Sequence, residues 1–264
     1  MKHILAAILL VLLLFPSLAF GVTVDDLVWR DGICYKKFSD IPFTGKVTGL
    51  WQGSFRGGKK IGPWVSYYKN GQLKFKGAYK NGERHGLVFT YHKNGQLDSK
   101  RTYKDGVQYG LSFYYLDDGK LFAKNTYKNG KQHGLSFLYW ENGKLFEKIT
   151  YKNDKRHGLR FVYYKTGPLA QKQTYKNDKR EGPWVEYHKN GKLRQKGTYK
   201  NDKMEGPWVG YHKNGQLKFK GTQKNGKMEG PWVIYNKNGN KSFTGVKFLH
   251  EGTGTYKNGV KVSD

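Results

Sequence analysis

A glycine recurs every 24 residues through most of this 264-residue chain, with no insertion or deletion between one occurrence and the next. A tyrosine follows each of these repeat glycines by five positions, and a second glycine follows by nine. A fixed period of this length is the signature of a repeat architecture, in which each unit is a supersecondary element that packs on its neighbours. The repeat glycines are Gly62, Gly86, Gly110, Gly134, Gly158, Gly182, Gly206 and Gly230.

Each unit is typical of one β-hairpin. The first unit contains two turn signals, Lys69-Asn70-Gly71 and Lys80-Asn81-Gly82, and the segments between such turns are rich in Val, Phe, Tyr and Thr. Short β-prone segments separated by Asn-Gly turns indicate antiparallel strands. No segment after residue 21 has a helical pattern, so no helix is available to cover a sheet. The expected fold is therefore all-β: an elongated, curled single-layer antiparallel sheet of repeated hairpins.

Counting residues along the hairpin predicts which side chains share a face. Leu135, Phe137 and Tyr139 precede the Asn-Gly turn at odd positions, and Leu145 follows it at another odd position. A three-residue loop with a left-handed glycine keeps Tyr139 and Leu145 on one face, whereas a two-residue turn separates them. The apolar pattern therefore favours the three-residue loop and predicts a packed face built from Leu or Pro, Val or Phe, and Tyr.

The units fall into two classes, four with Pro-Trp-Val after the repeat glycine and four with Leu-x-Phe. The same parity places the tryptophans opposite the packed face, beside the lysines. Such a stripe suits a membrane interface, sugar rings or a partner protein. The alternative is that the tryptophans cover the aliphatic stems of lysines. The candidate binding residues are Trp64, Trp184, Trp208, Trp232, Lys196, Lys200 and Lys220.

The two ends of the chain differ from the repeats. A basic start, an apolar run from Ile4 to Phe15 and small residues before position 22 predict a cleaved signal peptide. We therefore expect an exported protein that is periplasmic, secreted or in the cell envelope. Repeat arrays also need atypical ends. The expected division is a signal peptide at 1–21, an N-terminal cap at 22–61, eight repeats at 62–253 and a C-terminal cap or tail at 254–264.

The formal net charge of +28 implies an anionic partner such as lipid headgroups, acidic glycans or nucleic acid. An export signal makes nucleic acid the least favoured of the three. The alternative is that the lysines keep an aromatic-rich sheet soluble and its edges unpaired. Cys34 is the only cysteine, which excludes an intramolecular disulfide. It is expected to be a buried, inert thiol, although pairing with another chain is possible.

Polar residues recur at fixed positions instead of converging on one site. Histidines such as His85 and His133 hold equivalent positions, and such positions lie two strands, about 9.6 Å, apart, too far for a shared zinc ion. Glutamates such as Glu205 recur likewise, and an ion pair with a neighbour such as Lys203 explains them best. Nucleophile-elbow, zinc-protease and phosphate-loop motifs are absent from the sequence. We expect no enzymatic activity, no metal and no cofactor.

The run Gly77-Ala78-Tyr79-Lys80-Asn81-Gly82-Glu83-Arg84-His85-Gly86 resembles the core of a MORN (membrane occupation and recognition nexus) repeat. The phrase Glu205-Gly206-Pro207-Trp208-Val209-Gly210-Tyr211-His212-Lys213-Asn214-Gly215 resembles the bacterial variant of that repeat. The resemblance spans Gly62 to Gly259 and implies an elongated, curled antiparallel sheet. It also implies membrane-surface association or protein scaffolding, and some bacterial relatives are antitoxin-like.

Two functional hypotheses follow. In the first, an exported, non-enzymatic repeat scaffold binds an anionic surface, either lipid headgroups or envelope glycan, through a basic face that carries the tryptophans. In the second, the chain is a protein–protein interaction module that holds its partner in an aromatic trough on the other face, and an antitoxin-like role is one form of this hypothesis.

Overall fold

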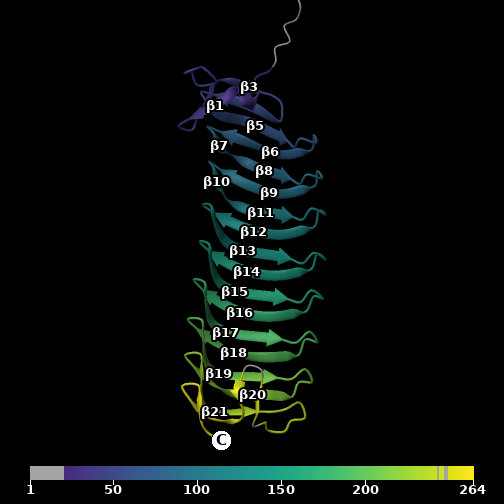
Figure 1. Cartoon of the computed structure of the whole chain (residues 1–264), viewed down its shortest axis with the longest axis vertical. Helices are drawn as coiled ribbons and strands as arrows, with labels where there is room; N and C mark the ends of the chain where they lie inside the picture. The colour runs from purple at the N-terminus through teal and green to yellow at the C-terminus, as the bar shows by residue number, and fades with distance from the viewer. Residues whose placement is uncertain (1–20, 243, 247–248) are drawn as a thin grey trace, which may run out of the picture.

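The computed structural model describes residues 21–242, 244–246 and 249–264. The predicted signal peptide lies outside this range except for Gly21, and it stays a prediction. Among the described residues, 21 strands form one open antiparallel sheet. They stack along a single long axis, with β3 near one end and the C-terminus at the other (Figure 1). The predicted all-β sheet of 24-residue repeats is confirmed.

The strands of the long sheet follow one another in chain order. Their bounds are β3 (Gly45–Val47), β4 (Trp51–Arg56), β5 (Lys59–Tyr67), β6 (Leu73–Lys80), β7 (Glu83–Arg84), β8 (Gly86–Tyr91), β9 (Leu97–Lys104), β10 (Val107–Gln108), β11 (Gly110–Tyr115), β12 (Leu121–Lys128), β13 (Lys131–Tyr139), β14 (Leu145–Lys152), β15 (Lys155–Tyr163), β16 (Leu169–Lys176), β17 (Lys179–Tyr187), β18 (Leu193–Lys200), β19 (Lys203–Tyr211), β20 (Leu217–Lys224), β21 (Lys227–Ile234), β24 (Gly254–Lys257) and β25 (Val260–Ser263).

Two short hairpins and one turn of 3-10 helix lie outside this sheet. The hairpins are β1 (Leu27–Arg30) with β2 (Ile33–Lys36), and β22 (Thr244–Val246) with β23 (Leu249–Glu251), and the helix is η1 (Val24–Asp26). Within the described part of the chain, no helix has the length and apolar character needed to cross a membrane. In β2 of the N-terminal hairpin, Cys34 is a fully buried free thiol, and its burial raises the pKa of the thiol group.

Two kinds of turn alternate along the edges of the sheet. Between β13 and β14, Trp140 N–H donates to the carbonyl of Lys144, and Gly143 N–H donates to the carbonyl of Trp140. Gly143 has a φ of 78°, a left-handed conformation that glycine adopts without strain. This is the predicted three-residue loop, and it pairs Tyr139 with Leu145 as expected. At the opposite edge the turns have two residues, such as Asn153-Asp154, both with positive φ.

In the first seven units a second bulge follows the three-residue loop, and it was not predicted from the sequence. Tyr139 pairs with Leu145, but Leu138 pairs with Glu147, so Phe146 has no partner of its own. One extra residue on one strand shifts the register by one and exchanges the faces of every later side chain. The prediction that Leu135, Phe137 and Tyr139 lie on the packed face is therefore wrong. The extra residue puts them on the face opposite to the one that Ile149 and Tyr151 occupy.

The repeat glycine marks a bend in the sheet. Asn125 pairs with Ser136 and Tyr127 with Gln132, so His133 and its neighbours up to residue 135 face a single residue of β12. Gly134 lies in this excess segment with a φ of 100°, a value that other residues rarely adopt. The same irregularity recurs at each later repeat glycine up to Gly230. The sheet thereby curls over its own apolar face, so this face is covered without a second layer of helices or strands.

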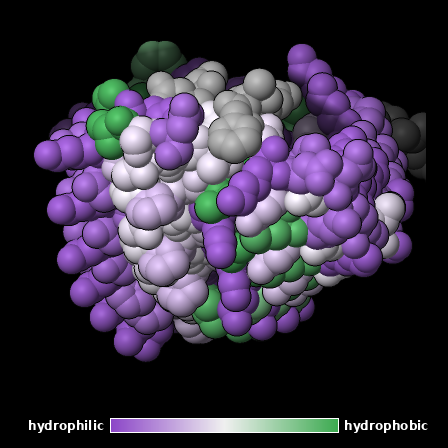
Figure 2. Space-filling model, turned by 90° about the horizontal axis from the view of Figure 1, so that it is seen from below, coloured by the Kyte–Doolittle hydropathy of each residue, from purple (hydrophilic) through white to green (hydrophobic). Residues whose placement is uncertain are grey.

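In the first seven units, the buried face carries the residues found 2, 4, 13, 15 and 17 positions after the repeat glycine. We call the opposite face the lysine face, because a lysine stands 14 positions after the repeat glycine in seven units. Viewed from the C-terminal end, a band of pale and hydrophobic side chains lies between two hydrophilic margins (Figure 2).

An insertion interrupts the last repeat, and the sheet resumes after it. β24 pairs with β21 through Gly230 and Tyr256, and Trp232 faces Gly254. This is the register that Trp208 and its partner have in the preceding unit. Within the segment 254–264, predicted to be a cap or tail, β24 therefore completes the eighth hairpin and β25 pairs with β24 as the last strand, so the repeats extend beyond residue 253. This segment can form the second strand of the hairpin because Gly-Thr-Tyr-Lys-Asn-Gly at 254–259 has the same residue types as the second strands of the other units.

Candidate binding surfaces

The four repeat tryptophans are buried, and they do not lie on the lysine face. Their exposed fractions are 0% for Trp64, 7% for Trp184, 4% for Trp208 and 2% for Trp232. The prediction that they form a stripe beside the lysines is wrong, because the second bulge puts them on the buried face. Lys196, Lys200 and Lys220 are exposed on the other face, so the seven predicted binding residues do not form one site.

Each buried tryptophan depends on glycines in the neighbouring strands. Trp208 faces Gly221 in its own hairpin, and its ring lies across Gly197 of the preceding unit, where a Cβ atom would come within 2.2 Å of the indole. A Cβ atom at Gly221 would meet Trp232 at 2.1 Å. Each of the four tryptophans faces a glycine of its own hairpin, whereas the Leu-x-Phe units have a larger residue at that position. This pairing was visible in the sequence and would have predicted the buried packing.

Phenylalanines of the Leu-x-Phe units lie under lysines on the lysine face. Phe137 is half-buried, and the Nζ atoms of Lys124 and Lys148 each lie 5.8 Å from its ring centroid. Phe161 has the same relation to Lys172 at 5.7 Å. The prediction that these phenylalanines belong to the packed face is therefore wrong. Cation–π contact and cover by lysine stems account for apolar rings on this face.

Ten lysines form a double row along one edge of the lysine face. In five consecutive hairpins, the residues on either side of the two-residue turn are both lysine and pair directly across the strands. All ten are exposed, and among the described residues none forms an ion pair. Like charges in directly opposed positions destabilise a sheet. The lysine row comprises Lys128, Lys131, Lys152, Lys155, Lys176, Lys179, Lys200, Lys203, Lys224 and Lys227.

The carboxylates beside the lysine row accept hydrogen bonds from other residues of the repeats. Asp178 and Asp202 accept hydrogen bonds from the backbone and side chains of Arg156 and Arg180, and these bonds lower the pKa of both carboxyls. Glu205 accepts a hydrogen bond from Asn225 N–H at 2.8 Å, and Glu181 and Glu229 make the equivalent bonds to Asn201 and Asn258. The predicted lysine ion pairs of these glutamates are not formed, since the glutamates bind the turn of the following unit.

Histidines of the repeats are also structural. His92, His188 and His212 each place Nε2 at 2.9–3.0 Å from a tyrosine carbonyl of the next unit. Among the described residues, no three His, Cys, Asp or Glu side chains are grouped closely enough to hold a metal ion. The equivalent histidines thus connect successive units along the sheet.

Arg160 takes the place of tryptophan on the buried face of the fifth unit. Its guanidinium donates to Glu147 Oε2 at 2.5 Å and to Gln171 Oε1 at 3.0 Å, and Glu147 is 9% exposed. Removing one partner of such a pair leaves the other charge without its counter-ion in a poorly hydrated place.

We therefore expect Glu147→Leu to lower the free energy of unfolding by about 1–2 kcal/mol, because Arg160 keeps only the bond to Gln171. Denaturant titration measures the change. The matched control is Glu83→Leu, which removes an exposed carboxylate and is expected to cost less than about 0.5 kcal/mol. Equal losses in both variants would contradict a structural role for the ion pair.

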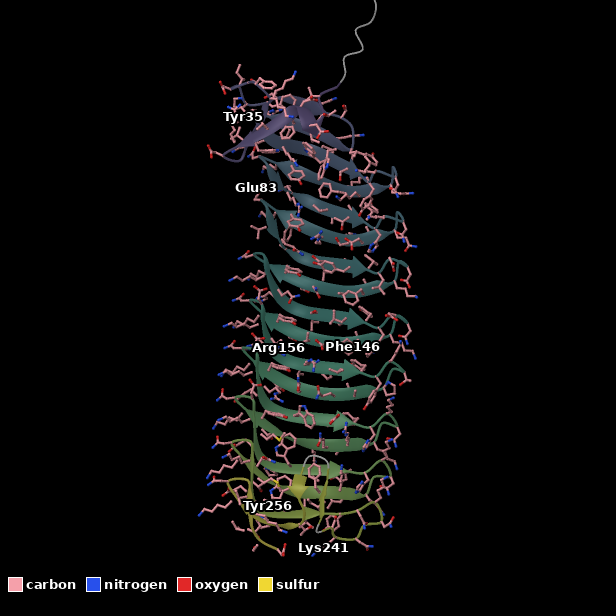
Figure 3. The ribbon with its side chains drawn as sticks, in the orientation of Figure 1. Tyr35, Glu83, Phe146, Arg156, Lys241 and Tyr256 are labelled. Carbon is pink, nitrogen blue, oxygen red and sulfur yellow. The ribbon has the colours of Figure 1, made fainter. Side chains whose placement is uncertain are left out.

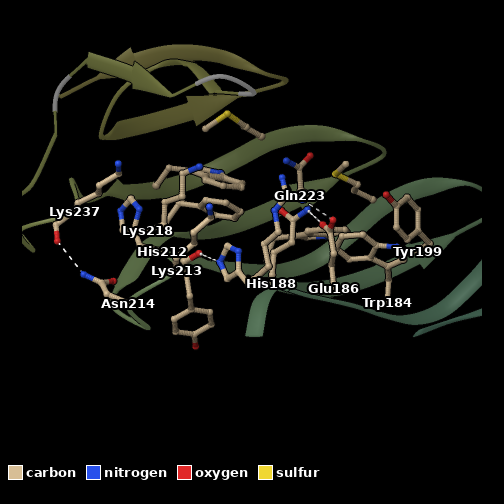
Figure 4. A pocket seen from close by; sticks show the side chains of 18 of the residues that line it. Trp184, Glu186, His188, Tyr199, His212, Lys213, Asn214, Lys218, Gln223 and Lys237 are labelled. Carbon is tan, nitrogen blue, oxygen red and sulfur yellow. Dashed lines mark hydrogen bonds and ion pairs between the residues drawn. The ribbon is translucent and has the colours of Figure 1, made fainter. Parts of the chain in front are cut away.

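A large hollow lies on the buried face at the C-terminal end of the sheet. Its volume is about 1610 Å³, and its lining comes from the fifth to eighth units. Trp184 and Tyr199 lie toward one end, and Lys218, His212 and Lys237 lie toward the other (Figure 4). Burial, with a smaller contribution from the nearby charge of Arg194, lowers the pKa of the Lys218 ammonium group. The cavity is therefore aromatic at one end and cationic at the other.

Comparison with known proteins identifies the repeat. A family model described as MORN repeat variant matches seven consecutive segments, which together cover more than half of the chain. The matched residues are 60–81, 84–105, 108–129, 132–153, 156–177, 180–201 and 204–225. No curated protein matches the chain.

Among solved structures, choline binding protein F from Streptococcus pneumoniae is similar at 15% identity. The alignment covers 86% of this chain and 97% of that one, with a TM-score of 0.16. A TM-score this low carries no argument about fold or ligand.

Proposed function

The chain belongs to the MORN repeat variant family and is a repeat scaffold, and from that premise we propose that it binds an anionic surface through the lysine row. We further propose that it is exported and has no catalytic activity of its own. The proposal differs from the sequence-based hypothesis in one respect. The surface is basic without tryptophan, since all four repeat tryptophans are buried on the other face.

The observation that carries the proposal is the set of five opposed lysine pairs. Equivalent lysines in successive units are separated by two strands, about 9.6 Å, so the row is a regular line of charge. Its mutual repulsion is relieved when phosphate or carboxylate groups bind between the lysines. Nitrogen-tipped side chains project from the turn edges along the whole length of the sheet (Figure 3). A long, flat array of this kind fits an extended anionic surface better than a small anion.

We expect the triple variant Lys179→Gln, Lys200→Gln, Lys203→Gln to bind vesicles with phosphatidylserine about 100-fold more weakly than the parent chain, at about 1 kcal/mol per lysine. Co-sedimentation at two salt concentrations measures the effect, and salt should weaken parental binding because exposed charges are screened. Phosphatidylcholine vesicles serve as the neutral control. A parallel titration with a soluble acidic polysaccharide distinguishes glycan from lipid as the source of the anion.

The matched control removes three exposed lysines from the opposite turn edge, as Lys69→Gln, Lys93→Gln, Lys165→Gln. It has the same change in net charge and should weaken binding less than about threefold. If both triple variants lose binding equally, net charge alone attracts the surface and the lysine row is not the site.

A further inference from the structure

The seventh unit combines two departures on the buried face beside the bend. The residue that pairs with the repeat glycine is a tyrosine in the other hairpins and Gln223 in the seventh. Two positions before the repeat glycine, the first six units have Lys, Arg or Gln, whereas the seventh has Met204 and the eighth has Met228. The seventh unit alone has both changes. The tyrosines are Tyr79, Tyr103, Tyr127, Tyr151, Tyr175, Tyr199 and Tyr256.

These two departures open the cavity at the C-terminal end. In the preceding units a guanidinium stacks on the tyrosine, with Arg156 at 4.4 Å from the Tyr175 centroid and Arg180 at 4.1 Å from that of Tyr199. The seventh unit has neither the cation nor the ring, and Met204 and Gln223 both line the hollow. Phe219 and Met228 complete an apolar lining. Methionine adapts its shape to different ligands, which suits a binding surface.

Two buried polar atoms in this lining have no hydrogen-bond partner. Trp208 Nε1, a donor, and Gln223 Oε1, an acceptor, are both buried and unpaired, and their side chains are only 4% and 8% exposed. Trp64 Nε1 in the first unit, away from this cavity, is unpaired as well. The equivalent Nε1 of Trp232 donates to the carbonyl of Thr222 at 3.0 Å. Trp208 faces Gly221, so Gln223 is its diagonal neighbour, about 7–8 Å away on the same face. A buried donor or acceptor without a partner costs about 1–3 kcal/mol.

The charges around the cavity favour an anion. Lys218, Lys213 and Lys237 line its cationic end, together with His212 (Figure 4). Glu186 is the one carboxylate in the described lining, and it already accepts hydrogen bonds from Arg194 at 2.6 Å and from Gln195 at 2.7 Å. The ligand therefore has an acidic part for the lysines and an apolar part for the methionines and Phe219.

Among anions with an apolar part, a peptide satisfies the unpaired atoms best. A fatty acyl chain has no hydrogen-bonding group to offer Trp208 Nε1 or Gln223 Oε1. A sugar stacks on exposed flat rings, whereas the indoles here are almost covered. A peptide bond supplies a carbonyl for the indole and an N–H for the amide oxygen. We propose that the cavity of the seventh unit binds an extended segment of a partner protein in which acidic and apolar side chains alternate.

The test uses fluorescence anisotropy of the full chain with three labelled nine-residue peptides that alternate Glu with Leu, Lys with Leu, or Glu with Ser. The Glu/Leu peptide is expected to bind at least tenfold more tightly than the other two. Gln223→Tyr restores the residue of the other units and fills the cavity, so it should weaken this binding at least tenfold while the thermal midpoint stays the same or rises. Trp208→Phe removes the indole donor while keeping an aromatic ring, and it should weaken binding about fivefold, equivalent to about 1 kcal/mol.

Lys196→Ala, on the lysine face, is the control and should leave peptide binding unchanged. The triple lysine-row variant should also retain it, so this proposal and the anionic-surface proposal can fail separately. Lys218→Gln should weaken the Glu/Leu peptide several-fold even if Gln223→Tyr proves unstable. Equal binding by a folded Gln223→Tyr variant, equal binding of the Lys/Leu peptide, or no binding of any peptide overturns the proposal. Displacement of a bound peptide by oleate but not by excess unlabelled peptide would assign the cavity to a lipid instead.

Discussion

Replacing Trp208 with alanine is expected to lower the free energy of unfolding of the C-terminal repeats by about 3–5 kcal/mol, the usual loss for a large aromatic side chain removed from a core. The ring is almost fully buried and packs against two aromatic rings of the sixth unit, 5.4 Å from the ring centroids of both Trp184 and Tyr199. Because each repeat contacts only adjacent repeats, the loss should be local. Hydrogen exchange should accelerate in the sixth to eighth units and change little in the first four.

Two controls separate burial from a surface role for the tryptophan. Trp208→Phe keeps a ring in place and should cost less than half as much. Trp29→Ala removes an indole that is 53% exposed, and it should cost about 1 kcal/mol or less. If Trp208→Ala leaves exchange rates unchanged but abolishes binding to anionic vesicles, the tryptophan acts at the surface and the buried packing described above is wrong.

Placing alanine at Gly221 is expected to cost about 3 kcal/mol, at the upper end for overpacking a core. The added Cβ atom would lie 2.1 Å from Cδ2 and 2.3 Å from Cε2 of Trp232. The indole has little room to retreat, since it is buried and its Nε1 is bonded to the carbonyl of Thr222. Denaturant titration with a fluorescence probe in the eighth unit measures the loss.

A double-mutant cycle isolates the contact with Trp232. In a Trp232→Val background, Gly221→Ala should cost about 1 kcal/mol or less, because the ring that collides with the new methyl group is gone. At the equivalent place, a Cβ atom at Gly77 would lie 3.1 Å from Cγ2 of Val88. The second unit shows that valine fits this place, since Val88 occupies the tryptophan position there and is fully buried. A cost that stays near 3 kcal/mol in both backgrounds would mean that Gly221 is required for its backbone and not for the packing of the ring.

Many residues of the candidate binding surfaces could be identified from the sequence, but the face of the sheet on which each residue lies could not. The lysines of the row are easily found, because each flanks a two-residue turn. The cavity was not predicted, because the features that the repeats share do not indicate it. Its signal was the opposite one: Gln223 where the other hairpins have tyrosine, together with Met204 where the first six units have a polar or cationic residue. In a repeat array the other units serve as an internal standard, so a departure from them can mark a local function.

The sequence alone determined the period, the hairpin in each unit and the three-residue loop, because these depend on local turn chemistry. Glycine at Gly143 and Asn-Gly pairs have strong conformational preferences that no distant contact overrides. The tertiary structure decided which face is buried. That choice depends on an unpaired residue such as Phe146, which costs the chain little locally but exchanges the faces of all later residues. The bulge is retained because the tryptophans then pack across the glycines of adjacent strands, a gain that exists only when neighbouring repeats are stacked.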